Sequence, residues 1–316
     1  MKHALLLLIA AHLMILSPLS AWAEAEQTPD RSGPETVTLE LSDGLKIHGL
    51  RTGWVQIKTA HYTYRPPAFL AAVRIVTDNN WAPWLPVYAY VIEHSDVTLM
   101  VDTGPDPLST DLAYFDCNSG NRFFYGRNLR FIVDDGANVV DQLAKVGLAP
   151  ADIDQLVITH FHSDHIGMLD AFLGVELITG PGNWPHHTGA HMCVVPDQMT
   201  PPRPATYNDG PLGVFTASEK ISGDGRVRLV PLPGHTPGHI GVMVQDQARY
   251  WLMAGDATFN TAQTLAGDIA GVSQLVDAAR DSQANIKRQL EDFNTVLLPA
   301  HDPEALVNLD ASFDRR

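Results

Sequence analysis

The sequence predicts a single α/β domain, and three observations support this class. The chain has 316 residues, enough for one large domain with a substantial core. Hydrophobic residues make up 45% of it, as in soluble globular proteins, which excludes disordered and fibrous classes. Strand-like and helix-like segments follow one another from residue 37 to residue 316 without a change in composition, so we assign residues 37–316 to one domain.

The N-terminal region is predicted to lie outside this fold. Lys2 precedes an almost wholly apolar run from Ala4 to Leu16, and Ala21-Trp22-Ala23 has the small-x-small pattern of a signal-peptidase site. We therefore expect residues 1–23 to be a signal peptide that is removed on export, with the periplasm as the expected location. An uncleaved membrane anchor is the alternative. Residues 24–36 are polar and contain Pro and Gly, and they predict a flexible leader.

Within the domain, periodicity and turn residues predict the elements in order. Strands are expected at 37–47 (a hairpin around Asp43-Gly44), 87–94, 97–104, 156–159, 226–235, 249–256 and 295–301. Helices are expected at 138–146 and 276–291. Residues 174–223 are rich in Pro, Gly and His, and they predict long loops.

Charge and cysteine content restrict the partners and the redox state. Removal of the signal peptide takes away only Lys2, which leaves 20 basic and 36 acidic residues and a formal net charge of −16. So acidic a chain is not expected to bind nucleic acid or to associate stably with anionic membranes. It can bind a small neutral substrate, and it could form a homodimer. After export, Cys117 and Cys193 either form a disulfide or remain two unpaired thiols.

Side chains that can bind a metal follow four of the predicted strands. The stretch "LVITHFHSDH", residues 156–165, crowds three histidines and an aspartate behind a β-branched run, and three other strands end on a histidine or an aspartate. The seven side chains are His160, His162, Asp164, His165, His235, Asp256 and His301. Strand ends are rigid, and imidazole and carboxylate groups suit zinc. The sequence therefore predicts a metal cage rather than a histidine-rich surface loop.

These residues resemble the signature of a known family. "HFHSDH", residues 160–165, fits the HxHxDH motif of the metallo-β-lactamase-fold hydrolases, and His235, Asp256 and His301 follow in the order and spacing of its two-metal members. The resemblance extends from about Val87 to Asp302. It implies an α/β fold of four layers, an αβ/βα sandwich in which two mixed β-sheets are flanked by helices.

The resemblance also implies a role for each ligand. The implied sets are His160, His162 and His235 for the first metal, Asp164, His165 and His301 for the second, and Asp256 as the bridge. We expect two Zn²⁺, with Mn, Co or Fe as substitutes. Asp164 and Asp256 are the predicted catalytic carboxylates, because Asp164 could also pass a proton to the leaving oxygen. Asp102 resembles a residue that orients a ligand imidazole by accepting its N–H.

Within the family, the chain is most similar to the N-acyl-homoserine lactonases. "PVYAYVIEHSDVTLMVDTG", "GDATFNTAQ" and "LPAHDPEA" resemble the corresponding stretches of that group. This implies opening of the lactone ring of a quorum-sensing signal. The aromatic residues of "NWAPWLP" and "NRFFYG" would then line the groove for the acyl chain, or else serve in ordinary packing.

Phe259 departs from the lactonase pattern. Several lactonases have a tyrosine three residues after the bridging aspartate, and its hydroxyl steadies the developing oxyanion. An exported organophosphate or aryl-ester hydrolase, or another lactonase or esterase of the same fold, is therefore the alternative function. Of the remaining histidines, His239 is expected to be structural. A solvated position rather than an extra metal site is expected for the others that we consider: His186, His187 and His191 in "NWPHHTGAH", and His48, His61 and His94.

Overall fold

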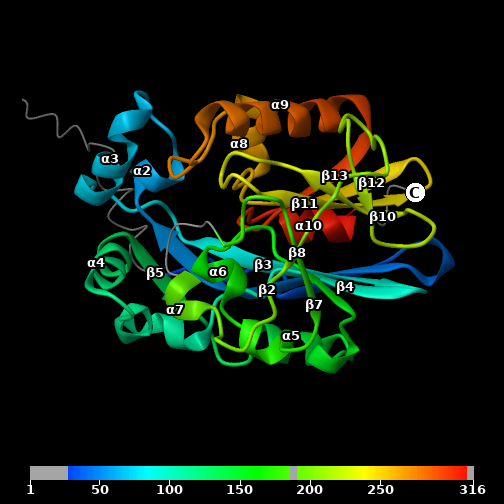
Figure 1. The fold of residues 1–316 in the computed structure, drawn as a ribbon, viewed down its shortest axis with the longest axis horizontal. Coiled ribbons are helices and arrows are strands. Elements are labelled where there is room, and N and C mark those ends of the chain that lie inside the picture. The colour runs from blue at the N-terminus through cyan, green and yellow to red at the C-terminus, as the bar shows by residue number, and fades with distance from the viewer. Residues whose placement is uncertain (1–27, 186–190, 312–316) are drawn as a thin grey trace, which may run out of the picture.

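The computed structural model describes residues 28–185 and 191–311 of the chain. They form four layers, with two mixed β-sheets face to face and helices on both outer sides (Figure 1). This confirms the predicted sandwich. The predicted signal peptide, residues 1–23, and the first part of the predicted leader lie outside the described residues. Among the described residues, no helix has the length and apolar character needed to cross a membrane.

The first sheet has the strand order β1-β2-β3-β4-β6-β7-β8, and β5 also pairs with β2. The pairs from β1 to β4 are antiparallel, and those from β4 to β8 are parallel. Its strands are β1 (Thr36–Glu40), β2 (Lys46–Ile57), β3 (Leu85–His94), β4 (Val97–Val101), β5 (Leu129–Ile132), β6 (Gln155–Val157), β7 (Glu176–Thr179) and β8 (Arg203–Pro204).

The second sheet has the order β13-β12-β11-β10-β9, in which only the β12–β13 pair is parallel. Its strands are β9 (Glu219–Lys220), β10 (Val227–Pro231), β11 (Ile240–Asp246), β12 (Arg249–Gly255) and β13 (Asn294–Pro299). The described helices are α2 (Thr59–Tyr62), α3 (Ala71–Thr77), α4 (Ser119–Asn128), α5 (Val139–Lys145), α6 (Ser163–Ile166), α7 (His191–Val194), α8 (Thr261–Ala266), α9 (Val276–Asp292) and α10 (Ala305–Ala311).

The layers form because the central strands are apolar on both faces. In β3, the odd-numbered residues from Val87 to Val91 join the core beneath the outer helices. The even-numbered residues from Tyr88 to Ile92 join the core between the two sheets. Successive side chains of a strand point to opposite faces, so such a strand must be covered on both sides. Figure 1 shows α9 and α8 covering the second sheet, and α4, α5 and α7 beyond the first.

The predicted hairpin around Asp43-Gly44 joins β1 to β2. Asp43 and Gly44 have φ values of 57° and 76°, and this left-handed backbone is the one that Asp-Gly turns favour. β2 then continues to Ile57. It pairs with β3 from Lys46 to Val55 and with β5 from Trp54 to Ile57. The end of β2 thereby reaches the end of the sandwich where the candidate site lies.

Several described elements are absent from the prediction, among them α3, α4 and β5, and two further regions show why. Residues 174–223 are not loop throughout, because β7 lies within them as a parallel partner of β6. This strand has only four residues, too few to show a period, and its place in the sheet is fixed by contacts with β6. β11 is missing from the predicted elements because "IGVMVQD" is a short apolar run, which periodicity alone does not assign to a strand.

The last residues of the predicted leader are tied to the domain. Arg31 donates two hydrogen bonds to the carboxylate of Asp134, at 2.9 and 3.0 Å. The backbone N–H of Arg51 donates to the carbonyl of Glu35 at 2.8 Å. Thr36 is already the first residue of β1. These contacts fix residues 31–36 against the first sheet.

Candidate metal centre

The seven side chains of the predicted cage converge at one end of the two sheets. Each follows the end of a strand: His160, His162, Asp164 and His165 follow β6, His235 follows β10, Asp256 follows β12, and His301 follows β13. Because β12 and β13 are parallel, Asp256 and His301 leave the sheet at the same edge. The donor atoms form two groups, and all donor atoms of one group lie within 4.8 Å of one another.

The first group consists of three imidazoles and one carboxylate. His162 Nδ1 lies 2.8 Å from His160 Nε2 and 3.0 Å from His235 Nε2. Asp256 Oδ2 lies 3.4 Å from His235 Nε2 and 3.7 Å from His160 Nε2. Burial holds the pKa of His160 and of His235 well below the ordinary histidine value. Both rings therefore stay neutral and keep a lone pair for a cation.

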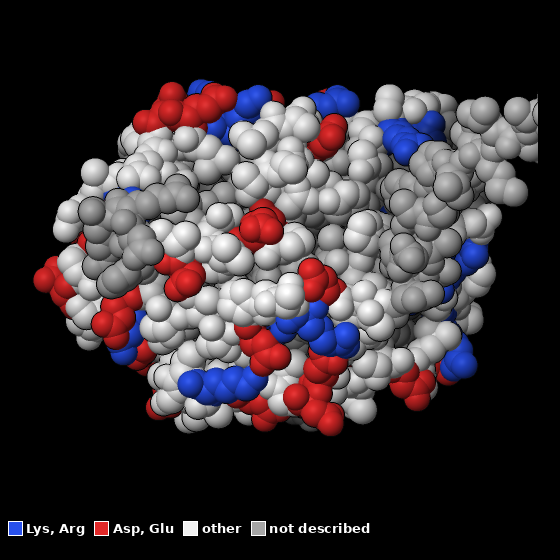
Figure 2. All heavy atoms as spheres, turned by 180° about the vertical axis from the view of Figure 1, so that it is seen from behind, with Lys and Arg blue, Asp and Glu red and all other residues white. Residues whose placement is uncertain are grey.

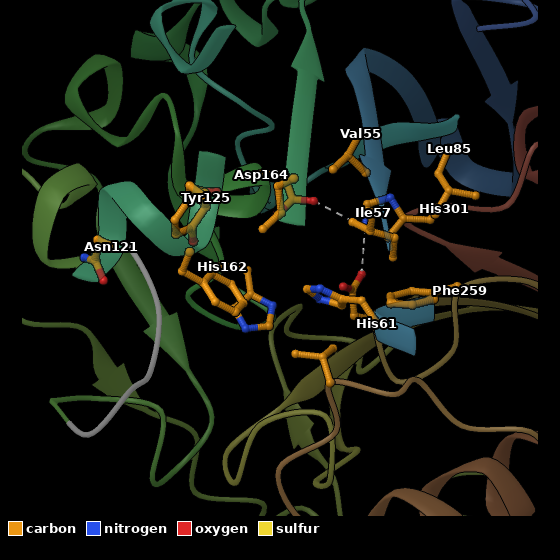
Figure 3. A pocket seen from close by; sticks show the side chains of 15 residues that line it. Val55, Ile57, His61, Leu85, Asn121, Tyr125, His162, Asp164, Phe259 and His301 are labelled. Atoms are coloured by element: carbon orange, nitrogen blue, oxygen red, sulfur yellow. Dashed lines mark ion pairs between the residues drawn. The ribbon is translucent and has the colours of Figure 1, made fainter. Parts of the chain in front are cut away.

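The second group consists of Asp164, His165 and His301, with Asp256 beside it. His301 Nε2 lies 3.1 Å from Asp256 Oδ1 and 3.5 Å from Asp164 Oδ2 (Figure 3). Burial acts to lower the pKa of His301, but the carboxylates of Asp256 and Asp164 raise it above the ordinary value. The two carboxylates thus favour positive charge at this place, which a divalent cation would supply.

Two buried atoms at the centre show that the donor set fits metal ions. His165 Nε2 and Asp256 Oδ1 lie 3.3 Å apart, but neither has a hydrogen-bond partner of good geometry. Leaving a buried polar atom unpaired costs about 1–3 kcal/mol, and coordination to a cation would satisfy both atoms. Imidazole nitrogen and carboxylate oxygen are ligands that zinc takes. The seven residues therefore fit a pair of divalent cations.

Buried hydrogen bonds behind the ligands fix their orientation. Asp102 Oδ2 accepts from His165 Nδ1 at 2.8 Å, and His301 Nδ1 donates to the carbonyl of Pro86 at 2.8 Å. Both rings consequently turn Nε2 toward the centre, and the interaction predicted for Asp102 is confirmed. His239 is structural, as predicted, because its Nε2 accepts from the backbone N–H of Asp256 at 3.1 Å.

Glycine allows the loop that carries His235 to approach its neighbours. Gly234 has φ of 139°, and a Cβ there would lie 2.2 Å from the backbone nitrogen of Ala279 in α9. The sequence gives no signal for a second support of this loop, Asn183. Its buried Nδ2 donates to the carbonyls of Thr159 and Gly238 at 3.1 and 2.7 Å. One amide thus connects the loops that carry His160 and His235.

Comparison with known proteins identifies the family. Residues 82–301 match the model of the metallo-beta-lactamase superfamily. The chain belongs to this superfamily. Membership and the converging donor set together make it a metal-dependent hydrolase, the class that the sequence predicts.

Individual members of the superfamily are related at low identity. The chain is 26% identical over 268 residues to the probable metallo-hydrolase Rv2300c of Mycobacterium tuberculosis, covering 76% of this chain and 82% of the relative. It is 24% identical over 226 residues to an N-acyl homoserine lactonase of a Bacillus species, covering 70% and 82%. Among solved structures, a single-residue mutant of AiiA from B. thuringiensis with N-decanoyl-L-homoserine bound superposes with a TM-score of 0.62 at 17% identity, covering 82% of this chain and 93% of that one.

A cavity of about 350 Å³ opens onto the metal centre. Its floor carries His162, Asp164, Asp256 and His301. Figure 3 labels three of them, His162, Asp164 and His301, together with apolar side chains around them. The apolar lining residues are Val55, Ile57, Leu85, Phe124, Tyr125, Leu129, Phe259 and Val272. The volume lies near the lower end of the roughly 300–1,000 Å³ range of small-molecule sites.

The two aromatic stretches have different places in the structure: one lines the cavity, and the other contributes a tryptophan to ordinary packing. Asn121, Phe124 and Tyr125 of "NRFFYG" line the cavity, as predicted for a substrate groove. Trp81 of "NWAPWLP" instead lies against a cation, since the ammonium of Lys58 is 3.5 Å from the centre of its ring. The guanidinium carbon of Arg130 in β5 also lies 4.0 Å from the centre of this ring, so Trp81 packs between basic side chains beside β5.

The prediction of solvated histidines is wrong for three residues, and His186 and His187, to which it also applies, lie outside the described residues. His48 is buried, and it bonds to Thr38 at 2.8 Å and to Glu93 at 2.7 Å. The side chain of His94 is also largely buried between two aspartates. His61 is buried and lines the cavity. Contacts with segments far along the chain bury all three, and no local pattern indicates such contacts.

Cys117 and Cys193 form a disulfide, which decides between the two predicted alternatives. It joins the segment before α4 to α7 across 76 residues of sequence. The amide of Asn121 donates to the sulfur of Cys193 at 3.4 Å, and Asn121 is itself a lining residue. The disulfide therefore supports the side of the cavity formed by α4.

Proposed function

We propose that the protein is a dinuclear zinc hydrolase that opens the lactone ring of N-acyl-homoserine lactones. One observation carries the dinuclear part of the proposal. The two oxygens of Asp256 face different groups: Oδ2 lies 3.4 Å from His235 Nε2, and Oδ1 lies 3.1 Å from His301 Nε2. A carboxylate divided in this way is suited to bridge two cations. Two zinc ions would lower the pKa of a shared water and polarise a carbonyl oxygen.

The protein's own groups would orient the ligands and handle the proton. Burial opposes ionisation of Asp256, but the imidazoles of His301 and His165 hold the pKa of its carboxyl well below the ordinary value. Asp256 thus stays available as a bridging anion. Hydrolysis joins the oxygen of water to the lactone carbonyl carbon and breaks the ring C–O bond. The leaving alkoxide needs a proton, and Asp164, which lines the cavity, would take that proton from the attacking water and deliver it to the alkoxide.

The cavity supports an acylated neutral substrate. Its lining is mostly aliphatic and aromatic, with polar groups gathered at the floor, which suits an acyl chain attached to a polar ring. Several relatives carry the name of N-acyl homoserine lactonase. Figure 2 shows one face of the molecule, on which basic side chains lie in separate patches among acidic ones. We expect a small uncharged ester or lactone rather than a polyanion as the partner.

Phe259 favours one second candidate, an aryl-ester or organophosphate hydrolase. Its ring is buried, and its centre lies 5.5 Å from that of His301 and 6.1 Å from that of His235. No hydroxyl reaches the centre from this position. Hydrolysis of a substrate with an aromatic leaving group depends less on a hydrogen bond to the developing oxyanion than lactone hydrolysis does. Such a substrate would therefore be less affected by phenylalanine at this position.

A substrate panel separates the two candidates. It comprises acyl-homoserine lactones of several chain lengths, simple γ- and δ-lactones, aryl esters and a phosphotriester, all assayed with zinc-loaded protein. We expect the highest kcat/KM for an acyl-homoserine lactone. Faster turnover of the aryl ester or the phosphotriester would replace the lactonase proposal with the second candidate.

We also propose that the protein acts after export, with residues 1–23 removed. The apolar N-terminal segment and the Cys117–Cys193 disulfide support an oxidising location. The test is fractionation of an expressing bacterium followed by N-terminal sequencing. A periplasmic product that begins at Glu24 is the expected result, and a cytoplasmic product that retains residues 1–23 would contradict it.

A further inference from the structure

His61 is a buried imidazole at the cavity that belongs to neither metal-ligand group. It is 7% exposed and lines the cavity. In the view of Figure 3 its ring lies between His162 and Phe259, which line the same cavity. Its Nδ1 is enclosed and has no hydrogen-bond partner. Because a substrate cannot reach an enclosed atom, the ring nitrogen that a substrate in the cavity can meet is Nε2, which is not among the enclosed atoms without a partner.

Contacts at the N-terminal end of the short helix α2 hold His61, which is part of this helix, in a fixed position. Asp78 accepts hydrogen bonds from Thr59 Oγ1 at 2.6 Å and from the backbone N–H of Ala60 at 2.7 Å. Gly271 lies against the other side of this turn, since a Cβ there would be 1.9 Å from the carbonyl oxygen of Ala60. A side chain supported in this way is preorganised, as a catalytic group requires.

From its C-terminal side, α2 is tied to the segment that follows the bridging carboxylate. Gln263 donates to the carbonyl of Tyr62 at 3.1 Å and accepts from the backbone N–H of Phe259 at 3.2 Å. The rings of Tyr62 and Phe259 stack with centres 5.6 Å apart. Phe259, which has no hydroxyl, and the helix that carries His61 are thus held together as one rigid unit.

The chemistry of this ring suits hydrogen-bond donation to a carbonyl. Burial lowers the pKa of His61 to about 3, with a further contribution from His162. The ring is therefore neutral near pH 7, and one of its two nitrogens carries a proton. A neutral imidazole can donate to an oxygen without adding positive charge beside the metal centre.

We propose that His61 donates a hydrogen bond to the carbonyl oxygen of the substrate and stabilises it as it gains negative charge. His61 would then be a catalytic residue that takes the part of the hydroxyl missing at Phe259. This inference rests on the proposed ester or lactone hydrolysis, because it needs a carbonyl substrate.

The direct test compares His61→Phe, which keeps an aromatic ring, with His61→Asn and His61→Gln, which return an N–H donor near the position of one or the other ring nitrogen. Loss of one such donor lowers kcat by about 10²-fold. We expect that loss in His61→Phe, with little change in KM, and recovery of at least tenfold in one of the two amide variants. Zinc content and melting temperature are measured for every variant, so that a folding defect is recognised.

A double variant makes the test independent of any single substitution. In the background of His61→Phe, Phe259→Tyr places a hydroxyl at the neighbouring position, and we expect it to restore kcat at least tenfold. In the wild-type background the same substitution should change kcat less than threefold, because the donor is already present. His48→Phe is the matched control: it removes a buried histidine that does not line the cavity, and it should lower the melting temperature without lowering kcat.

Two results would overturn the role of His61. One is a kcat within threefold of wild type in folded, zinc-loaded His61→Phe. The other is a loss in His61→Phe that neither an amide variant nor Phe259→Tyr reduces. All variants are assayed on the best lactone and the best aryl ester of the panel. If wild type hydrolyses only the ester, the lactonase proposal fails, while the ratio of variant to wild type on that ester still tests His61.

Discussion

The floor and the wall of the cavity are built in different ways. The floor carries His162, Asp164, Asp256 and His301, all placed by the ends of buried strands. The wall on the side of α2 and α4 is made from short helices, and its supports are the Asp78 carboxylate and the Cys117–Cys193 disulfide. The floor fits the chemistry of the whole superfamily, whereas the wall is where the preference of one member for its substrate would arise.

This difference predicts that changes in the floor abolish turnover, whereas changes in the wall at residues other than His61 shift specificity or stability. The largest effect is expected for Asp256→Asn. The amide lacks the second anionic oxygen, so both groups lose a ligand, and kcat should fall by more than the roughly 10²-fold that loss of a supporting residue costs. Zinc content should fall with it. Full activity with two zinc ions would show that Asp256 is not the bridge.

An intermediate effect is expected at Asp102, directly behind the floor. Asp102→Asn removes one of two carboxylate oxygens that accept from Thr159 and His165. Asparagine tolerates the φ of 59° found here, so the backbone should be preserved. Zinc affinity should fall about 10- to 100-fold, measured by competition with a chelator. Unchanged affinity would mean that the contact with His165 does not orient that ligand.

A smaller and selective effect is expected in the wall. Phe124→Ala shortens a lining side chain, and it should lower kcat/KM by about tenfold for a long acyl chain but by less than threefold for a short one. The neighbouring Phe123→Ala is the control, because Phe123 is 62% exposed and does not line this cavity. Equal losses for long and short chains would show that α4 does not contact the acyl group.

The smallest effect on turnover is expected from the disulfide. Replacing Cys117 and Cys193 with serine should lower the free energy of unfolding by about 2–4 kcal/mol, because the bond closes a long loop. The kcat at 25 °C should stay within threefold of wild type. The checks are chemical denaturation and the same lactonase assay. A free energy of unfolding equal to that of wild type would show that the disulfide does not stabilise the wall.

The sequence predicts the floor much better than the wall, for a physical reason. Each ligand of the floor directly follows an apolar strand, so a local pattern carries its position, and the seven predicted side chains do converge. The helix that carries His61 is held by Phe259 and Gln263, about 200 residues away along the chain. In the same way, β7 owes its place to β6. Such contacts leave no local period. Asn183 was missed for the same reason, because its partners lie on separate loops.

The most direct test of the central claim is a zinc titration of chelated, refolded protein with lactonase activity measured at each step. Two zinc ions per chain, held by the seven converging residues, should bring activity to its plateau, and chelation should abolish it reversibly. Elemental analysis gives the metal content at the plateau. Full lactonase activity in protein that holds no metal would contradict the account.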